Sequence, residues 1–375
     1  MSSLSIKDAS LALMMVPGIG KAFYARLMEE FGSPIEVWRS RPSALRSIGV
    51  LPEKTIHSIL AGVDMDALEM LKNDLGSLDA WFMTIHDEDY PPVLRDIHLP
   101  PPVLFGVGDR WVLKQKAIAI VGSRKASSYG RRVARELAQG LCAQGFVVVS
   151  GLAMGIDSAA HEGALSIGGL TVAVIGCGLD VNYPVRNKGL KDQIARNGVV
   201  ISEFLPGTRP EPGNFPARNR IISGLSQAVV VVEAGPGSGS LITAYLGMEQ
   251  GREVMAVPGS IYSFNSKGCH QLIREGAALI TGLNDIIREI GGNFFEKGVA
   301  ESREKVKVSS LSQDERHVVD NLEAEPQHID EIAARCNMAA SLINPVLLQL
   351  ELKGLVISHP GGKYSIKDCD LSKIS

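Results

Sequence analysis

The hydrophobic pattern is most regular in the central part of the chain, residues 116–290. Short continuous apolar runs alternate there with longer stretches at helical spacing, and such runs are typical of parallel strands buried on both faces. The predicted strands are Ala117–Val121, Phe146–Ser150, Leu170–Ile175, Val199–Ser202, Ala228–Glu233 and Glu253–Val257. The predicted helices are Tyr129–Gln144, Ile156–Ile167, Asn187–Asn197, Arg218–Leu225, Ser240–Gln250 and His270–Glu275. This alternation predicts an α/β fold with a Rossmann-like, doubly wound parallel sheet.

The segments before this region have other patterns. Residues 1–75 predict a small helical domain, interrupted by the Gly-x-Gly turn of Val16–Gly20 that matches a SAM or helix-hairpin-helix fold. Such a turn can hold a phosphate, but this segment is acidic, so a packing module without DNA contact is the other interpretation. Residues 76–290 then form the Rossmann-like domain. It opens with a proline-rich connector, 80–115, whose predicted strands are Trp81–Ile85 and Val103–Gly106.

The C-terminal part predicts a second small fold. Residues 291–310 are a mixed Glu, Lys and Ser run and predict a linker. In residues 311–368 three helical stretches precede two short strands that a Gly-Gly turn separates, a pattern that indicates a winged helix. The stretches are Leu311–Leu322, Ile329–Cys336, Ser341–Lys353, Leu355–Ser358 and Lys363–Ile366.

Composition narrows the class of protein. The 375 residues are 45% hydrophobic and 21% charged, which is an ordinary globular balance. No apolar run is long enough to predict a membrane span, and the first residues do not resemble a secretory signal. The five cysteines are scattered and form no C-x-x-C pair, so we expect neither a disulfide framework nor a zinc site. A reducing cytoplasm is the expected location.

Charge is distributed unevenly. Residues 116–290 carry 17 basic and 13 acidic side chains, whereas residues 1–115 carry 11 and 15, and residues 311–375 carry 6 and 10. The basic centre would meet a polyanionic partner first, although a solvated surface gives the same balance. An acidic winged helix does not suit DNA reading. We therefore interpret the tail as a protein-contact or regulatory module.

Four glycine-rich loops follow predicted strands, and in open α/β sheets ligands bind beyond these strand ends. The loops are 122–124 (GSR), 150–157 (SGLAMGID), 176–178 (GCG) and 234–240 (AGPGSGS). Helix N-termini after such loops aim N–H groups at an anion, so the loops predict phosphate binding. The dinucleotide fingerprint and the mononucleotide P-loop are both absent. We therefore predict no cofactor.

Several side chains near these loops could take part. Arginine suits phosphate recognition, and Arg218 and Arg220 lie two apart, so at least one should face the strand-end groove. Asp157 and His161 match a metal pair or, preferably, a hydrogen-bonded pair that stabilises a helix. Cys177 has no nearby base and is interpreted as structural. Three aromatic residues belong either to the core or to a base-stacking surface: Phe215, Tyr262 and Phe264.

The ordered motifs of residues 10–290 resemble the DprA/Smf family, the bacterial DNA processing protein A. They include 122–124, 150–157, 176–184 (GCGLDVNYP), 215–224 (FPARNRIISG), 238–244 (SGSLITA), 251–259 and 268–277. The resemblance implies an extended Rossmann-like domain that binds single-stranded DNA without strong sequence preference. It also implies a dimer that protects incoming DNA and loads the RecA recombinase during natural transformation. It implies no enzymatic turnover, no catalytic residue and no metal. Carried onto this chain, the DNA pocket comprises Gly122, Ser123, Arg124, Arg218, Asn219, Arg220, Ser238, Gly239, Ser240 and Lys267.

One departure and two alternatives remain. Some family members have a basic residue where this chain has Met154, so either one phosphate contact is missing or Lys125 or Lys267 replaces it. The loop at 234–243 also resembles that of Rossmann-fold nucleotide phosphoribohydrolases, but Thr243 occupies the position of their catalytic carboxylate. A DNA-independent interaction scaffold is the third interpretation.

Overall fold

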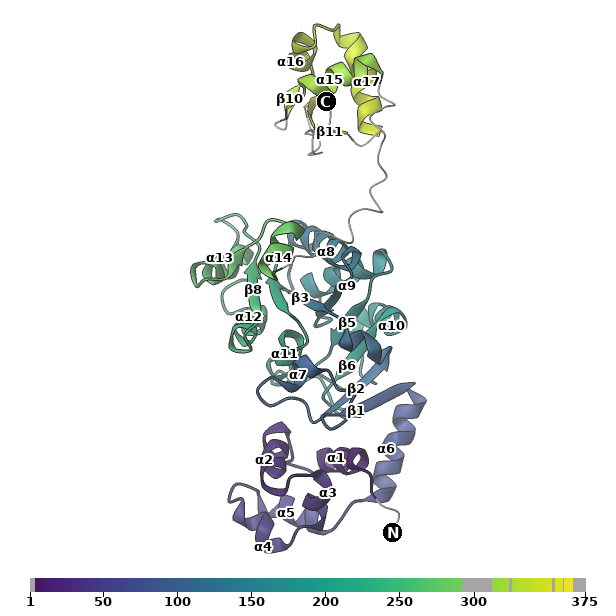
Figure 1. Cartoon of the computed structure of the whole chain (residues 1–375), viewed down its shortest axis with the longest axis vertical. Coiled ribbons are helices and arrows are strands. Elements are labelled where there is room, and N and C mark those ends of the chain that lie inside the picture. The colour runs from purple at the N-terminus through teal and green to yellow at the C-terminus, as the bar shows by residue number, and fades with distance from the viewer. Residues whose placement is uncertain (1–3, 292–311, 324–325, 353–354, 360, 367–375) are drawn as a thin grey trace. The chain divides into compact units, whose positions relative to one another are not determined.

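The computed structural model describes residues 4–291, 312–323, 326–352, 355–359 and 361–366. The chain divides into two compact units, residues 1–294 and 295–375, which are described separately (Figure 1). Apart from Gly291, the predicted linker at 291–310 lies outside the described residues. The predicted break between residues 75 and 76 falls inside the first unit.

The first unit is built around a nine-stranded sheet with the order β1-β2-β6-β5-β4-β3-β7-β8-β9. Seven neighbouring strands, from β6 to β9, run parallel. Strand β2 pairs antiparallel with β6, and β1 pairs antiparallel with β2. The strands are β1 (Ala80–Thr84), β2 (Val103–Gly108), β3 (Ala117–Val121), β4 (Val147–Ser150), β5 (Thr171–Val174), β6 (Val199–Ser202), β7 (Ala228–Val231), β8 (Glu253–Ala256) and β9 (Ala278–Leu279). Strand order reverses at β3, where β4 pairs on one side and β7 on the other.

Helices cover both faces of the sheet because the strand residues alternate between two cores. Ala117, Ala119 and Val121 of β3 enter one hydrophobic cluster, and Ile118 and Ile120 enter another. The first face is covered by α7 (Pro92–Arg95), α11 (Asn214–Gly224), α12 (Gly239–Glu249) and α13 (Lys267–Arg274). The second is covered by α8 (Ser128–Ala143), α9 (Ile156–Ser166), α10 (Lys188–Asn197) and α14 (Leu283–Glu289).

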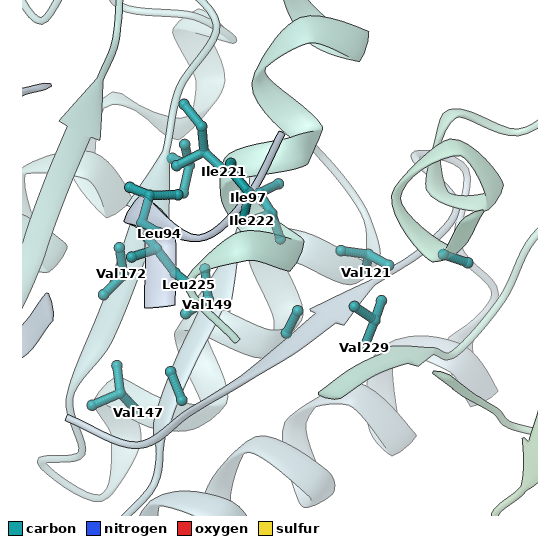
Figure 2. Close-up of a cluster of buried hydrophobic side chains, with 14 of the residues drawn as sticks. Leu94, Ile97, Val121, Val147, Val149, Val172, Ile221, Ile222, Leu225 and Val229 are labelled. Atoms are coloured by element: carbon teal, nitrogen blue, oxygen red, sulfur yellow. The ribbon is translucent and has the colours of Figure 1, made fainter. Parts of the chain in front are cut away.

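Figure 2 shows the first of these cores. Leu94 and Ile97, in and just after α7, pack with Ile221 and Ile222 of α11 over the valines of β4 and β5. These side chains are at most 5% exposed. The core thereby fixes α11 across the sheet, and α11 is the helix that carries the predicted site arginines.

The predicted doubly wound sheet is confirmed, with each of the six central strands matched to within a few residues. Helix α11 begins at Asn214, four residues before the predicted start, and so includes Pro216. A proline is tolerated there because the first N–H groups of a helix have no intrahelical partner. Helix α14 was not predicted, and a strand after the helix at 270–276 was expected without bounds, where β9 lies. The strand has only two residues, too few for a recognisable pattern.

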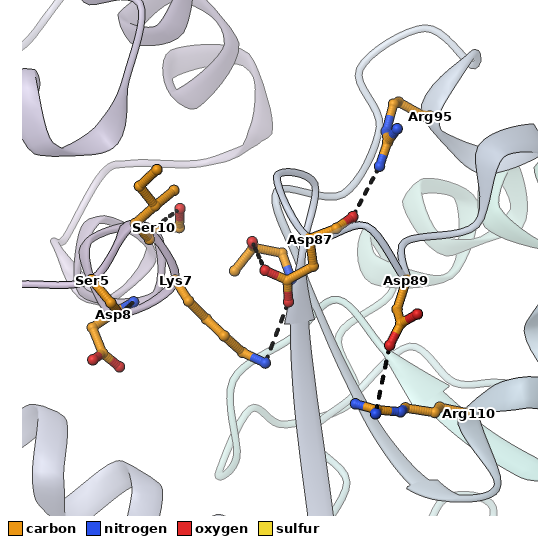
Figure 3. A network of polar contacts seen from close by, with 10 residues as sticks. Ser5, Lys7, Asp8, Ser10, Asp87, Asp89, Arg95 and Arg110 are labelled. Atoms are coloured by element: carbon orange, nitrogen blue, oxygen red, sulfur yellow. Dashed lines mark hydrogen bonds and ion pairs between the residues drawn. The ribbon is translucent and has the colours of Figure 1, made fainter.

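Residues before the sheet are helical, as predicted, and have a core of their own. The helices are α1 (Ile6–Met15), α2 (Lys21–Phe31), α3 (Pro34–Arg39), α4 (Pro42–Ser47), α5 (Glu53–Leu60) and α6 (Met65–Ser77). Helices α1 and α6 pack on the edge of the sheet. Polar contacts reinforce this packing. Lys7 Nζ lies 3.3 Å from a carboxylate oxygen of Asp87 (Figure 3), and Tyr24 Oη lies 2.9 Å from His86 Nε2.

Three short 3₁₀ helices complete the first unit: η1 (Arg110–Lys114), η2 (Val185–Asn187) and η3 (Phe264–Ser266). The second unit has the predicted winged-helix form, in which three helices share one core with a three-stranded sheet of order β10-β12-β11. Its elements are α15 (Gln313–Asn321), β10 (Gln327–His328), α16 (Ile329–Arg335), α17 (Ala340–Leu352), β11 (Val356–His359) and β12 (Lys363–Ile366).

Candidate functional site

A cavity of about 870 Å³ opens beyond the carboxyl ends of β3 and β7. These two strands pair with each other at the point where strand order reverses. Connections from such a point leave toward opposite faces of the sheet, so a crevice forms between the loops. The cavity therefore lies where an open α/β sheet ordinarily binds its ligand.

One wall of the cavity is the loop after β3, residues 122–125. The main-chain N–H of Ser123 donates to the carbonyl of Glu233, at the end of β7, over 2.7 Å. The buried carboxylate of Glu233 accepts hydrogen bonds from the N–H of Ser127, at 2.9 Å, and from its hydroxyl. The loop is thus held to the neighbouring strand at both ends.

Gly155 lets the next loop approach this wall closely. It has φ +89°, and a Cβ built on it would lie 2.2 Å from the carbonyl oxygen of Ser123. That carbonyl accepts the N–H of Ile156, the first residue of α9, over 3.2 Å. Only glycine satisfies both the conformation and the contact, which explains the glycine of the Gly-Ile-Asp part of the sequence motif.

The opposite wall is the start of α12. Ser238 caps this helix, and its hydroxyl accepts the N–H of Ser240 at 3.4 Å and lies 2.8 Å from the Ser240 hydroxyl. Ser238, Gly239 and Ser240 all line the cavity. Because the first N–H groups of a helix have no intrahelical partner, this wall offers donors and the positive end of a helix dipole.

The floor is formed by Arg218, whose side chain is buried. Its Nη1 donates to the carbonyls of Gly151, at 2.8 Å, and Val174, while Nε is buried without a partner. Burial lowers the pKa of Arg218 to about 10, so the guanidinium stays charged at neutral pH. The fixed charge lies under the cavity and joins the ends of β4 and β5.

Two further polar groups stabilise this floor. Asp157 accepts the N–H groups of Gly151 and Ala153 at 3.1 and 3.4 Å. Burial raises the pKa of the Asp157 carboxyl, and the charge of Arg218 opposes that rise. Asn219 Nδ2 donates to the carbonyl of Gly239 over 3.2 Å, so α11 holds the first turn of α12 in place.

Arg124 and Lys125 are exposed at the rim. Among the described residues neither side chain forms an ion pair or a hydrogen bond, and the Arg124 guanidinium lies 5.3 Å from the ring centre of Phe215. The charged residues that line the cavity are three cations, Arg124, Lys125 and Arg218, and one buried carboxylate, Asp157. The cavity is therefore cationic, with its freely available charges at the mouth.

Eight of the ten predicted site residues line this cavity, and Arg220 and Lys267 do not. At about 100° per residue, two positions along α11 turn Arg220 some 200° away from Arg218. Its guanidinium forms a buried ion pair with Glu203, at the end of β6. Lys267 is exposed at the start of α13. Lys125 and Lys267 were the two candidates to supply the charge missing at Met154. Of these, Lys125 lines the cavity.

The expected hydrogen bond between Asp157 and His161 is not formed. His161 Nδ1 instead lies 2.7 Å from the hydroxyl of Thr171, on β5, and the ring is fully buried. Burial lowers the pKa of His161 to about 3, so the ring is neutral at physiological pH. Cys177 is also buried, and burial raises the pKa of its thiol, which agrees with a structural role.

Other lining residues were not predicted, because distant loops bring them in. Pro210 and Pro212 come from the loop before α11, Tyr183 from the loop after β5 and Asn265 from the loop after β8. Tyr183 lies inside the 176–184 motif but was not singled out there, and the other three residues lie next to a motif rather than inside one. Within the described ranges, no cluster of three His, Cys, Asp or Glu side chains is arranged to hold a metal ion, and no helix has the length and apolar character needed to cross a membrane.

Fold and cavity together define a Rossmann-like protein with a cationic site at the switch point of its sheet, joined in one chain to a winged helix. The family model described as DNA recombination-mediator protein A matches residues 81–291, and the DprA winged helix domain matches residues 303–362. The chain belongs to this DNA processing family.

Relatives support the assignment along most of the chain. Protein Smf of Synechocystis sp. is 35% identical over 94% of this chain and 97% of its own length. DNA processing protein DprA of Streptococcus pneumoniae is 50% identical over 55% of this chain and 73% of its own length. The solved structure of DNA processing protein A from S. pneumoniae covers 75% of this chain and 97% of its own, with a TM-score of 0.69 and 38% identity. A second structure, of DNA processing protein A from Helicobacter pylori and concerned with its single-stranded DNA binding mode, covers 55% and 97%, with a TM-score of 0.50 and 32% identity.

Proposed function

We propose that this protein binds single-stranded DNA in the switch-point cavity, with little preference for sequence. The observation that carries the proposal is the cavity itself: exposed Arg124 and Lys125, the fixed charge of Arg218 and the start of α12 surround one space. Such groups contact phosphates, which are the same at every nucleotide. The single-stranded DNA binding mode described for the H. pylori relative supports the choice of ligand.

Each part of the cavity has a distinct task in this proposal. Arg124 offers a planar fork of donors to a phosphate, and its contact with Phe215 limits the orientations it must lose on binding. Gly122 and residues 238–240 bring main-chain N–H groups close to the DNA, and the serines at 123, 238 and 240 bring hydroxyls. Arg218 and Asn219 act from below: they fix the walls and add charge.

The family resemblance extends the proposal beyond the cavity. We infer that the protein acts as a homodimer in the cytoplasm, protects incoming single strands and loads the RecA recombinase during natural transformation. Membership of the recombination-mediator family supports a role of this kind.

We infer that the protein is not an enzyme. Hydrolysis of an N-glycosidic bond needs a carboxylate near the developing oxocarbenium ion. Thr243 lines the cavity at the position where phosphoribohydrolases have that group, and Asp157 is the one carboxylate among the lining residues that the structure describes. Asp157 is buried and already accepts two main-chain N–H groups.

The test is a titration of the full-length protein against a fluorescent single-stranded oligonucleotide and its duplex, over a series of salt concentrations. We expect preference for the single strand and a steep fall of affinity with salt, by roughly 0.7 in the logarithmic slope for each phosphate contact. Absence of binding at low salt would reject the proposal. Release of free base from a nucleoside monophosphate would support the enzyme instead.

A further inference from the structure

Two aromatic side chains project from the loop that follows β8, next to the mouth of the cavity. Tyr262 is 92% exposed and Phe264 is 63% exposed, and the neighbouring Ile261 is also exposed. Phe264 itself lines the cavity, together with the adjacent Asn265. Neither ring belongs to the hydrophobic core, although aromatic residues normally gain most by being buried. Exposed rings beside a cationic cavity favour a ligand that has both an apolar face and negative charge.

The base of this loop is firmly held. The main-chain carbonyl of Asn265 accepts the N–H of Ala234 over 2.7 Å, and its side-chain amide donates to the carbonyl of Lys125 over 2.9 Å. His270 Nε2 lies 3.0 Å from the carbonyl of Gly259, at the other end of the loop. These contacts join the loop to both cavity walls, so its two ends keep a defined position.

The Phe264 ring rests directly on the main chain of Gly235. A Cβ built on Gly235 would lie 2.4 Å from Cε1 of the ring, so any larger residue would displace it. One edge of the ring is thus supported while most of its surface faces solvent. Little conformational entropy remains to be lost when a flat ligand stacks on such a ring.

We propose that Tyr262 and Phe264 form a stacking surface for the unpaired bases of a strand whose phosphates lie against Arg124 and Lys125. The proposal rests on single-stranded DNA binding as the function, and it adds what the bases do. Every base has a π-face, so stacking is tolerant of sequence, as phosphate contacts are. Charge complementarity between the three lining cations and a phosphate chain brings the bases to the rings.

Stacking also explains why a single strand would be preferred over a duplex. Both carry phosphates that Arg124 could contact, but paired bases are already stacked within the helix and cannot reach the rings without unpairing. Preference for single strands is then a property of residues 262 and 264, and general affinity for polyanions is a property of the cations.

The experiment compares two probes of equal length and charge, an oligothymidylate and an abasic oligomer of the same sugar-phosphate repeat, on the full-length protein. We expect the wild-type protein to bind the oligothymidylate at least about ten-fold more tightly. Phe264→Ala should weaken oligothymidylate binding by about 5- to 100-fold, in line with the stacking of one base, and leave abasic binding unchanged. Tyr262→Ala should act in the same direction.

The matched control is Ile261→Ala, which removes an exposed apolar side chain from the same loop without removing a ring, and should alter neither affinity. Equal wild-type affinity for the two probes would overturn the stacking proposal and leave single-strand binding intact. If the wild-type protein bound neither probe, both the stacking proposal and single-strand binding would be rejected. Equal weakening of both probes by Phe264→Ala would also overturn the stacking proposal, because the loop would then shape the cavity. A change in the oligomeric state of the Phe264→Ala variant in sedimentation would overturn it too, because the loop would then join two copies.

Discussion

The chain contains two folds that commonly bind nucleic acid, and they differ in how their cationic side chains are placed. The sheet cavity gathers three cations and a helix start around one space. In the winged helix, α17 is the third helix, the position that enters the major groove in DNA-reading members of the helix-turn-helix class. Residues 340–352 contain no lysine or arginine, and Leu342 and Leu348 are 60% and 57% exposed.

The difference shows that architecture alone does not assign the DNA site. A winged helix that reads DNA needs cations on its third helix, because most contacts to a duplex are to phosphates. Exposed leucines suit contact with another protein instead. The same argument favours the first unit for the proposed phosphate site, because fold and charge agree there.

Removal of Arg124 should have the largest effect on DNA affinity. Arg124→Ala deletes an exposed, unpaired guanidinium at the cavity mouth. A charge-assisted hydrogen bond to phosphate is worth about 1.5–3 kcal/mol, so we expect single-strand affinity to fall about 10- to 100-fold and the salt slope to become shallower. Lys267→Ala is the control, since this exposed cation lies outside the cavity, and it should change affinity less than about two-fold. Unchanged affinity of the Arg124 variant would remove this residue from the site.

A carboxylate introduced at the start of α12 should have an intermediate effect. It should lower DNA affinity while leaving thermal stability equal or higher. Nothing lies within 4 Å of a Cβ built on Gly239, so Gly239→Asp fits without a clash. The new charge favours the helix N-terminus by about 0.3–1 kcal/mol but repels a phosphate there. We expect affinity about five-fold lower and thermal stability equal or higher, with Gly239→Ala as the neutral reference. Equal affinity of the two variants would mean that no phosphate lies at this helix start.

Removal of the winged helix should have the smallest effect. A chain that ends at residue 294 retains the whole first unit, including every lining residue of the cavity. We expect its single-strand affinity and salt slope to match those of the full chain within about two-fold in the same titration. A ten-fold loss would show that the second unit contributes directly to DNA binding, and the contrast between the two folds would fail.

Local pattern was enough to predict the sheet and the loops that surround the cavity. Continuous apolar runs marked the central strands because both faces of those strands are buried. Parallel strands bring their carboxyl ends to one edge, so the order of strands and glycine-rich loops along the chain was enough to place residues 122–124 and 234–240 together. The winged helix followed from its spacing of helices and strands in the same way.

Pairing between distant residues could not be predicted. Nothing near Arg220 in the sequence shows that Glu203 lies beside it in space, and that partner, not the local motif, removes Arg220 from the cavity. His161 likewise pairs with Thr171 and not with the residue one turn away. The packing of the Phe264 ring likewise involves a distant residue, Gly235, which lies on another loop.

The buried carboxylate of Glu233 makes completion of the cavity depend on residues far apart in the sequence. It bonds to Ser127, 106 positions earlier, and the loop it holds also receives Asn265, which lies 140 positions after Lys125. Contacts of such long sequence separation must overcome a large loop-closure entropy, which slows their formation. During synthesis, the wall that carries Arg124 therefore leaves the ribosome long before the residues that shape it, and a nascent chain gains its site only when β7 and the loop after β8 have joined the sheet.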